Sequence, residues 1–165
     1  MKYVLIALSF VCGMVLAYFL IDHYVSRTGH RAEGKWEEFR KVGKWTYWYT
    51  DSQKEAEGEY KGGLESGEWN YWHPNGQKSA LGVFVEGKRH GPWVEWYDNG
   101  QKQKEGMFEE DKEHGVWTRW WPNGNKKSQG EYFKGYQHGE WFYYSEVDGT
   151  AYEKKNYPTR HNVNR

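Results

Sequence analysis

The sequence predicts an all-β protein, an elongated antiparallel meander of about five β-hairpins preceded by one N-terminal transmembrane helix. Three observations lead to this prediction. The same residue pattern returns every 24 residues without a gap, turn-forming dipeptides divide each repeat, and the one long apolar run stands at the N-terminus. Beyond the first 21 residues no segment shows a helical period. A period of this size is typical of arrays in which each unit contacts its neighbours.

The repeat is visible as columns of like residues. A glycine is followed two positions later by a tryptophan at Gly91 and Trp93, and 24 residues later at Gly115 and Trp117. A second large ring comes three positions after each of these tryptophans. Another glycine column, which includes Gly106, is followed two positions later by Tyr or Phe. Chance does not maintain so many columns in one register.

The ends of the array are irregular, as terminal repeats usually are. Gly34 and Trp36 lie one period before a matching pair, so a half repeat is expected to open the array. The last repeat has one extra residue near 147–149. Allowing for it, Tyr157 falls in the aromatic column, whereas Lys155 stands where glycine is expected.

The turns predict what each unit folds into. Asn-Gly is the strongest short hairpin signal, because both residues tolerate positive φ. Each repeat therefore reads as one hairpin with an aromatic first strand and a more polar second strand, and five repeats give roughly ten strands at a spacing of about 4.8 Å. The Asn-Gly pairs are Asn75-Gly76, Asn99-Gly100 and Asn123-Gly124.

The aromatic and glycine columns predict how a sheet without a deep core is held together. Trp93 and Trp96 are three residues apart, so in a regular strand they point to opposite faces. Gly106 and its equivalents lack a Cβ, which lets a ring of a neighbouring strand lie flat across the backbone. Such cross-strand pairs contribute about 0.2–1 kcal/mol each.

The N-terminal run Tyr3–Ile21 contains 19 residues without a charge. As a helix it would be about 28 Å long, close to the hydrocarbon thickness of a bilayer. We expect a membrane anchor; a cleaved signal peptide ending near Val15–Ala17 and a buried helix are the alternatives. The very short N-terminal tail favours placing the repeats outside the cytoplasm. Cys12 lies inside this run and reads as an ordinary apolar position.

These features divide the chain into four parts. We predict an anchor or signal peptide at 1–21, a linker at 22–33, the repeat array at 34–157 and a polar tail at 158–165. The whole chain has 165 residues, a formal net charge of zero and a pI near 7.1. No bulk field would therefore draw it to nucleic acid, and one cysteine excludes an intrachain disulfide.

At this point two stretches resemble a known family. "GVFVEGKRHGPW", from Gly82 to Trp93, and "GEYFKGYQHGEW", from Gly130 to Trp141, are similar to MORN (membrane occupation and recognition nexus) repeats. The "WxxxxPNGxK" pattern from Trp69 to Lys78 resembles the bacterial variant of the repeat. The resemblance extends over about 34–157. It implies an elongated array of MORN-type β-hairpins without enzymatic chemistry, and antitoxin-like or envelope-associated relatives.

The candidate binding residues form two columns. The second ring of each repeat is expected to lie on the sheet face that is not covered, where aromatic side chains suit protein hot spots, sugar stacking or cation–π contact. The alternative is that these rings only cover their neighbours. A lysine column could form a basic stripe or a solvated edge that discourages sheet association. The residues are Trp48, Trp72, Trp96, Trp120 and Tyr144, and Lys54, Lys78, Lys102 and Lys126.

Catalytic and metal-binding patterns are not evident. His90, His114 and His138 form a column, but residues one repeat apart would be about 10 Å apart, too far to share an ion. We expect them in the turn before glycine, bonded to the local backbone. No serine has recurring His-Asp companions, and no phosphate-binding loop stands out. We therefore predict a protein without enzyme activity or cofactor.

Three functions agree with these patterns. The first is a membrane-tethered scaffold that binds a protein partner along the aromatic sheet. The second, suggested by the family resemblance, is an antitoxin or immunity-type protein that neutralises a toxic enzyme. The third is a module that binds a carbohydrate or cell-envelope polymer through the tryptophans. No nucleic-acid partner is expected.

Overall fold

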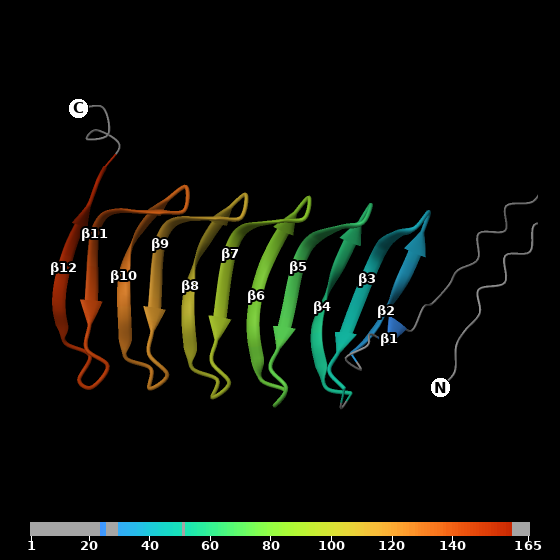
Figure 1. The fold of residues 1–165 in the computed structure, drawn as a ribbon, viewed down its shortest axis with the longest axis horizontal. Coiled ribbons are helices and arrows are strands. Elements are labelled where there is room, and N and C mark those ends of the chain that lie inside the picture. Colours follow the sequence, from blue (N-terminus) through green and yellow to red (C-terminus); the bar gives the residue numbers. More distant parts are fainter. Residues whose placement is uncertain (1–23, 26–29, 51, 160–165) are drawn as a thin grey trace, which may run out of the picture.

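The computed structural model describes residues 24–25, 30–50 and 52–159, and these form one antiparallel sheet of twelve strands (Figure 1). Each strand lies next to its neighbour in sequence, which confirms the predicted meander. Within these ranges no helix is long and apolar enough to cross a membrane, and the predicted span at 3–21 lies outside them. The strands are β1 (Tyr24–Val25), β2 (Arg31–Glu37), β3 (Arg40–Trp48), β4 (Lys54–Lys61), β5 (Leu64–Trp72), β6 (Lys78–Val85), β7 (Lys88–Trp96), β8 (Lys102–Glu109), β9 (Lys112–Trp120), β10 (Lys126–Phe133), β11 (Tyr136–Tyr144) and β12 (Ala151–Tyr157).

The sheet extends into the stretch predicted as a linker. β1 and the first residues of β2 fall within 22–33, and Tyr24 and Val25 pair with Ala32 and Arg31. Pairing in the sheet requires only backbone groups, and the short β1 has little of the repeat's residue pattern. The opening strand was therefore not apparent from the sequence.

Two kinds of turn alternate along the array, and they differ from the prediction. The Asn-Gly pairs lie in five-residue loops, and there only the glycine has positive φ, as at Gly100 with φ 82°. The two-residue turns with positive φ at both positions are at the other end of the sheet, as at Glu86 (φ 52°) and Gly87 (φ 78°). The asparagine is used for its side chain. The Oδ1 atom of Asn99 accepts a hydrogen bond from the Gln101 amide at 3.0 Å.

The predicted seating of tryptophan rings on glycine is confirmed. A Cβ added at Gly106 would stand 2.3 Å from Cδ2 of Trp117, which is impossibly close, so only glycine leaves room for the ring. The Trp117 indole N–H donates to the Met107 carbonyl at 3.0 Å, and the residue is fully buried. The same seat occurs at five places: Gly34 under Trp45, Gly58 under Trp69, Gly82 under Trp93, Gly106 under Trp117 and Gly130 under Trp141.

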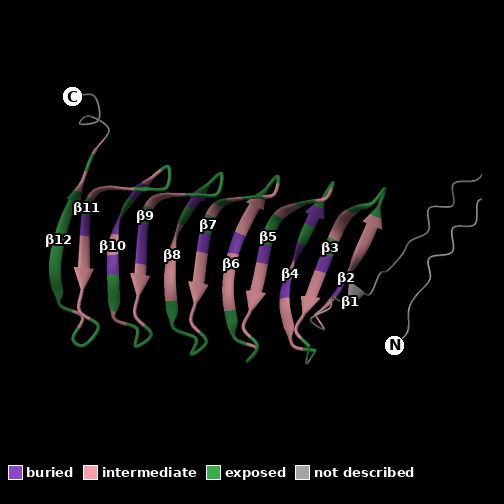
Figure 2. Cartoon of the chain, in the orientation of Figure 1, coloured by how far each residue is buried: buried purple, intermediate pink, exposed green. Residues whose placement is uncertain are grey.

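The seated rings form a continuous row. Phe108 stands between Trp93 and Trp117, with ring centroids 5.6 and 5.1 Å away and near-perpendicular planes. Edge-to-face pairs at these distances add about 0.5–1.5 kcal/mol each beyond area burial. The buried segments cross the middle of the strands from β2 to β11, as Figure 2 shows. Because the sheet has only one layer, this row of buried rings is its hydrophobic core.

Side chains of the five-residue loops link each repeat to the next. The Tyr97 hydroxyl donates to the Trp120 carbonyl at 2.9 Å, and Nδ2 of Asn99 donates to the Pro122 carbonyl at 2.8 Å. Both bonds join residues 23 positions apart. Equivalent bonds run from Tyr49, His73 and Trp121, and from Asn75 and Asn123.

The last strand ends the array by changing the glycine column. Lys155 pairs with Trp141 where the other repeats have glycine, as the sequence predicted. Its side chain lies over the Tyr143 ring, 5.2 Å from the centroid. Tyr157 packs edge-on against Trp141, and its hydroxyl lies 3.0 Å from that of Tyr143. Without a glycine, β12 has no seat for the ring of a further repeat.

Candidate functional site

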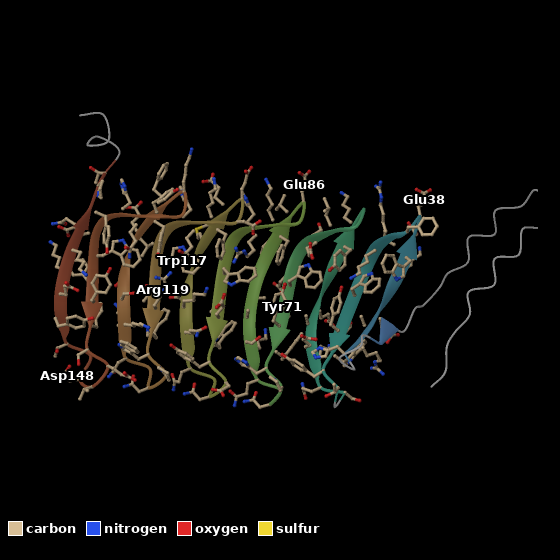
Figure 3. The ribbon with its side chains drawn as sticks, viewed as in Figure 1. Glu38, Tyr71, Glu86, Trp117, Arg119 and Asp148 are labelled. Carbon is tan, nitrogen blue, oxygen red and sulfur yellow. The ribbon has the colours of Figure 1, made fainter. Side chains whose placement is uncertain are left out.

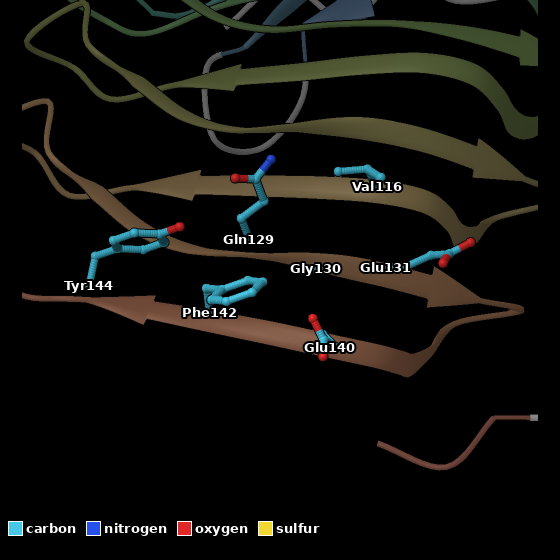
Figure 4. Close-up of a pocket in the computed structure, with 7 residues that line it drawn as sticks. All are labelled: Val116, Gln129, Gly130, Glu131, Glu140, Phe142 and Tyr144. Atoms are coloured by element: carbon cyan, nitrogen blue, oxygen red, sulfur yellow. The ribbon is translucent and has the colours of Figure 1, made fainter. Parts of the chain in front are cut away.

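The sheet has two unlike faces. We call the face with the seated tryptophans the ladder face and the opposite one the open face. Strand alternation places Trp141 on the ladder face and Tyr144, three residues on, on the open face. Figure 4 agrees, because Tyr144 lines one shallow hollow of about 400 Å³ with Val116 and Phe142. The predicted division of the two aromatic columns between opposite faces is confirmed.

The structure brings the two predicted columns together on the open face. Three of the four lysines reach the ring of the next repeat. Nζ lies 5.2 Å from the Trp72 centroid for Lys54 and 5.5 Å from the Trp120 centroid for Lys102. Lys126 lies likewise over Tyr144. Lys78 differs, because it donates to the Asn70 side chain at 3.1 Å. Trp48 is covered by the Arg31 guanidinium at 4.1 Å.

These lysines are also held by acceptors on their own strand. Lys54 lies 2.7 Å from Glu57, and Lys102 lies 2.6 Å from Glu105. The hydrogen bond from Lys54 is the main reason that the pKa of Glu57 is lowered, and Lys44 contributes. All five predicted rings, from Trp48 to Tyr144, are half-buried. On the open face, most of these rings are therefore covered by a cation, and Lys54 and Lys102 are held by neighbouring carboxylates. The two columns form neither an uncovered row of aromatic rings nor a row of unpaired lysines.

A second feature of the open face was missed from the sequence. The middle strands expose apolar side chains beside one another: Met107 is 51 % and Val116 59 % exposed. Val94 pairs with Leu81 across β6 and β7, and Pro92 with Met107 across β7 and β8. We call this set the central patch, and its members are Leu81, Val83, Pro92, Val94, Met107 and Val116. Reading each column for departures from its usual residue type, rather than for repetition, would have indicated it.

The columns that are apolar in the middle carry acids towards both ends. The column of Val83 and Met107 has Glu59 before it and Glu131 after it. The column of Pro92 and Val116 has Lys44 and Glu68 before it and Glu140, which pairs with Lys154, after it. Among the described residues Glu59, Glu68 and Glu131 are exposed and form no ion pair. The central patch is therefore flanked by negative charge on both sides.

On the ladder face, polar side chains close over the rings. Arg119 donates to Glu113 at 2.9 Å and places its guanidinium 5.5 Å from the Tyr132 centroid (Figure 3). Equivalent pairs six residues apart occur in the first and fifth repeats, but not in the described second and third repeats. Burial, and then the charge of Glu65, raise the pKa of Tyr71 to about 12 in the second repeat. The closing pairs are Lys41 with Tyr47, Glu113 with Arg119 and Gln137 with Tyr143.

The histidine column lies within strands rather than in turns, which corrects the prediction. His114 belongs to β9, with Nδ1 3.3 Å from the Glu109 carboxylate and its ring against Phe133. His138 also packs against Phe133. No group of three or more metal-ligating side chains is gathered within the part of the chain that the structure describes.

Comparison with known proteins identifies the repeat. The family model described as "MORN repeat variant" matches residues 89–110 and 113–134. No curated protein matches the sequence. Among solved structures, the crystal structure of TarM is similar, with 13 % identity over 73 % of this chain and 20 % of that chain and a TM-score of 0.34. This chain thus spans about a fifth of that protein. The two matched stretches are similar to MORN repeats of the variant type, and they share their columns with the rest of the array.

Proposed function

We propose that this protein is a non-enzymatic scaffold, tethered to a membrane, that binds a protein partner through the open face. The observation that carries the proposal is the central patch. It lies on a sheet with no second layer, so its apolar side chains are covered by nothing in the described structure. Contiguous exposed apolar surface of this kind marks interaction sites in soluble domains.

The open face has the size and the composition that a protein interface needs. The eight strands from β4 to β11 extend about 38 Å at a spacing of about 4.8 Å. A standard interface takes about 800 Å² per partner, or a square of about 28 Å. Trp96 and Trp120 lie at one border of the patch, and tryptophan is enriched among residues that dominate binding energy.

The acidic flanks indicate the partner's chemistry. In the described structure Glu59, Glu68 and Glu131 are exposed and form no ion pair, although Glu68 accepts a hydrogen bond from Asn70, so basic residues opposite them would not have to break existing ion pairs. The proposed partner therefore has an apolar centre with a basic rim. Association with such a partner becomes slower and weaker as salt screens the flanks. The tether in this proposal rests on the apolar run 3–21 alone.

A crosslinking experiment tests the proposal. A photo-reactive residue at Met107 of the full chain is expected to capture the partner in the native cell, whereas one at Val147, which is 91 % exposed in a distant loop, is not. The purified partner is then titrated with Val83→Asp and Met107→Asp, each checked for an unchanged melting curve. Loss of a central contact of about 2 kcal/mol weakens binding roughly 30-fold. Unchanged binding to both variants would overturn the open-face proposal.

A further inference from the structure

The loops at the lower edge of the sheet in Figure 1 hold each Asn-Gly pair by three hydrogen bonds. At Asn123, the Oδ1 atom accepts from the Asn125 amide at 3.0 Å, and Nδ2 donates to the Glu146 carbonyl of the next repeat at 2.6 Å. The main-chain amide of Gly124 donates to the Trp121 carbonyl at 2.9 Å. The same three bonds occur in the loops of Asn75 and Asn99.

An Asn-Gly pair can modify itself with water as the only co-reactant. The main-chain nitrogen of the glycine attacks Cγ of the asparagine, and the new C–N bond forms as the Cγ–Nδ2 bond breaks. The nitrogen's proton passes to solvent, and Nδ2 takes up a proton and leaves as ammonia. Water then opens the cyclic imide at either carbonyl and leaves aspartate or isoaspartate. Asparagine is thermolabile for this reason, and glycine, which has no Cβ, leaves the attack unhindered.

The three hydrogen bonds hold the reacting groups while the array is folded. The attacking nitrogen of Gly124 has its proton on the Trp121 carbonyl, and the leaving nitrogen of Asn123 is bonded to the next repeat. Attack requires that these bonds break together, because the amide nitrogen must lose its proton and the side chain must turn towards it. The rate of modification therefore follows the population of molecules in which the junction between two repeats is open.

The three junctions differ in how they are supported. Asn123 donates to the last hairpin, β11 and β12, and in the described sheet β12 has a neighbour on one side only. All residues of β12 except Tyr157 are exposed, and Lys155 replaces the glycine that would seat another ring. Asn75 and Asn99 donate to hairpins with neighbours on both sides. A terminal unit of an array has one interface instead of two, so it opens more often.

We propose that Asn123 is a site of spontaneous deamidation that fraying of the last hairpin exposes. The product loses the Nδ2 donor and places a carboxylate oxygen opposite the Glu146 carbonyl, so the hairpin opens more often once modified. Each event also adds one negative charge to a chain of formal net charge zero. The fifth repeat has a carboxylate at this place, Asp148, which accepts from Thr150. The site lies at the edge of the sheet and does not depend on the proposed open-face partner.

The test follows the conversion of each asparagine in the full chain by peptide mass mapping during incubation in mildly alkaline buffer. Asn75 is the matched internal control, because both it and Asn123 stand in the sequence Pro-Asn-Gly. In the folded protein Asn123 is expected to convert about tenfold faster than Asn75. In denaturant the two are expected to convert at equal rates, because no junction then protects either.

Two variants of β12 show whether fraying sets the rate. Tyr157→Ala removes the ring that packs against Trp141 and should speed the conversion of Asn123 several-fold while that of Asn75 stays unchanged. Tyr152→Ala, at a 65 % exposed position of the same strand, should change neither rate.

Four results would each overturn the proposal. They are equal rates at Asn75 and Asn123 in the folded protein, a faster Asn123 in denaturant as well, equal acceleration of both sites by Tyr157→Ala, and no conversion of folded Asn123 while the denatured chain converts. The second would assign the difference to local sequence, and the third would assign it to unfolding of the whole array.

Discussion

Replacing Gly106 with valine is the most direct test of how the sheet is stabilised. Valine has a high strand propensity and glycine a low one, so a view based on local propensity predicts a more stable protein. The structure predicts the opposite. A Cβ at this position would stand 2.3 Å from the Trp117 indole, and both ends of the clash are fixed, because the ring is fully buried. The ring has to leave its seat.

The magnitude follows from what the ring loses. A buried tryptophan covers about 150–250 Å², and exposing about 60 Å² costs about 1.5 kcal/mol at 25 cal/mol per Å². The indole bond to the Met107 carbonyl, at 3.0 Å, adds about 1 kcal/mol. Part of the edge-to-face contact with Phe108 is lost as well, about 0.5 kcal/mol. Relative to glycine, valine has a higher strand propensity and a lower backbone entropy in the unfolded chain, and together these offset about 1 kcal/mol of the loss. The net loss is about 2 kcal/mol.

The measurement is a thermal melt of the full chain followed by tryptophan fluorescence and near-UV circular dichroism. A loss of about 2 kcal/mol lowers the Tm by about 4–8 °C in a chain of this size. Met107→Val is the matched control, because that side chain is on the open face and 51 % exposed. Lys104 is unsuitable, since its ion pair with Glu95 would be lost too. A Gly106→Val protein that melts at or above the parent temperature would refute the account of the glycine seats.

Three further predictions concern the loops, the pH dependence and the N-terminus. Asn99→Ala removes the bonds to the Gln101 amide and the Pro122 carbonyl and should lower the free energy of unfolding by about 1–2 kcal/mol, whereas Asp98→Ala in the same loop should change it by less than about 0.5 kcal/mol. A denaturant titration measures both, and equal effects would contradict the linking role of the asparagine. The pKa of Glu57 is lowered in the folded state, mainly by the bond from Lys54, so its contribution is present above the unfolded pKa and is lost as pH falls through the folded pKa. Glu57→Gln should therefore show a smaller loss of Tm than the parent between about pH 5 and pH 2, and parallel curves would argue against this role. The run 3–21 should keep the protein in the membrane fraction after a carbonate wash, and a soluble form starting near residue 18 would show a cleaved signal instead.

Much of the fold could be predicted because the interactions that stabilise the sheet join residues close in sequence and recur in each repeat. The glycine seat and its ring are 11 residues apart at Gly106 and Trp117, and the pattern returns in every unit. Because no other residue leaves room for the ring, glycine stands at the same position of each such repeat, and the sequence alone shows it. The half repeat at Gly34 and the altered end at Lys155 were predictable for the same reason, since the sequence shows where the glycine column begins and where another residue replaces glycine.

The sequence by itself thus determined the meander, its period, the two aromatic columns and the seating of rings on glycine. Only the tertiary structure decided which side chains meet across repeats. Lys54 and Lys78 follow the same register shift, yet Lys54 reaches the Trp72 ring whereas Lys78 donates to Asn70, and the lysine column alone does not state which partner each takes. The exposure of the central patch was also known only from the structure. A one-layer sheet leaves one face uncovered, and the repeat pattern does not indicate which face that is. The bonding of one ring was decided there too. The indole N–H of Trp93 donates to the Glu95 carboxylate at 2.9 Å, whereas the other four seated tryptophans donate to main-chain carbonyls.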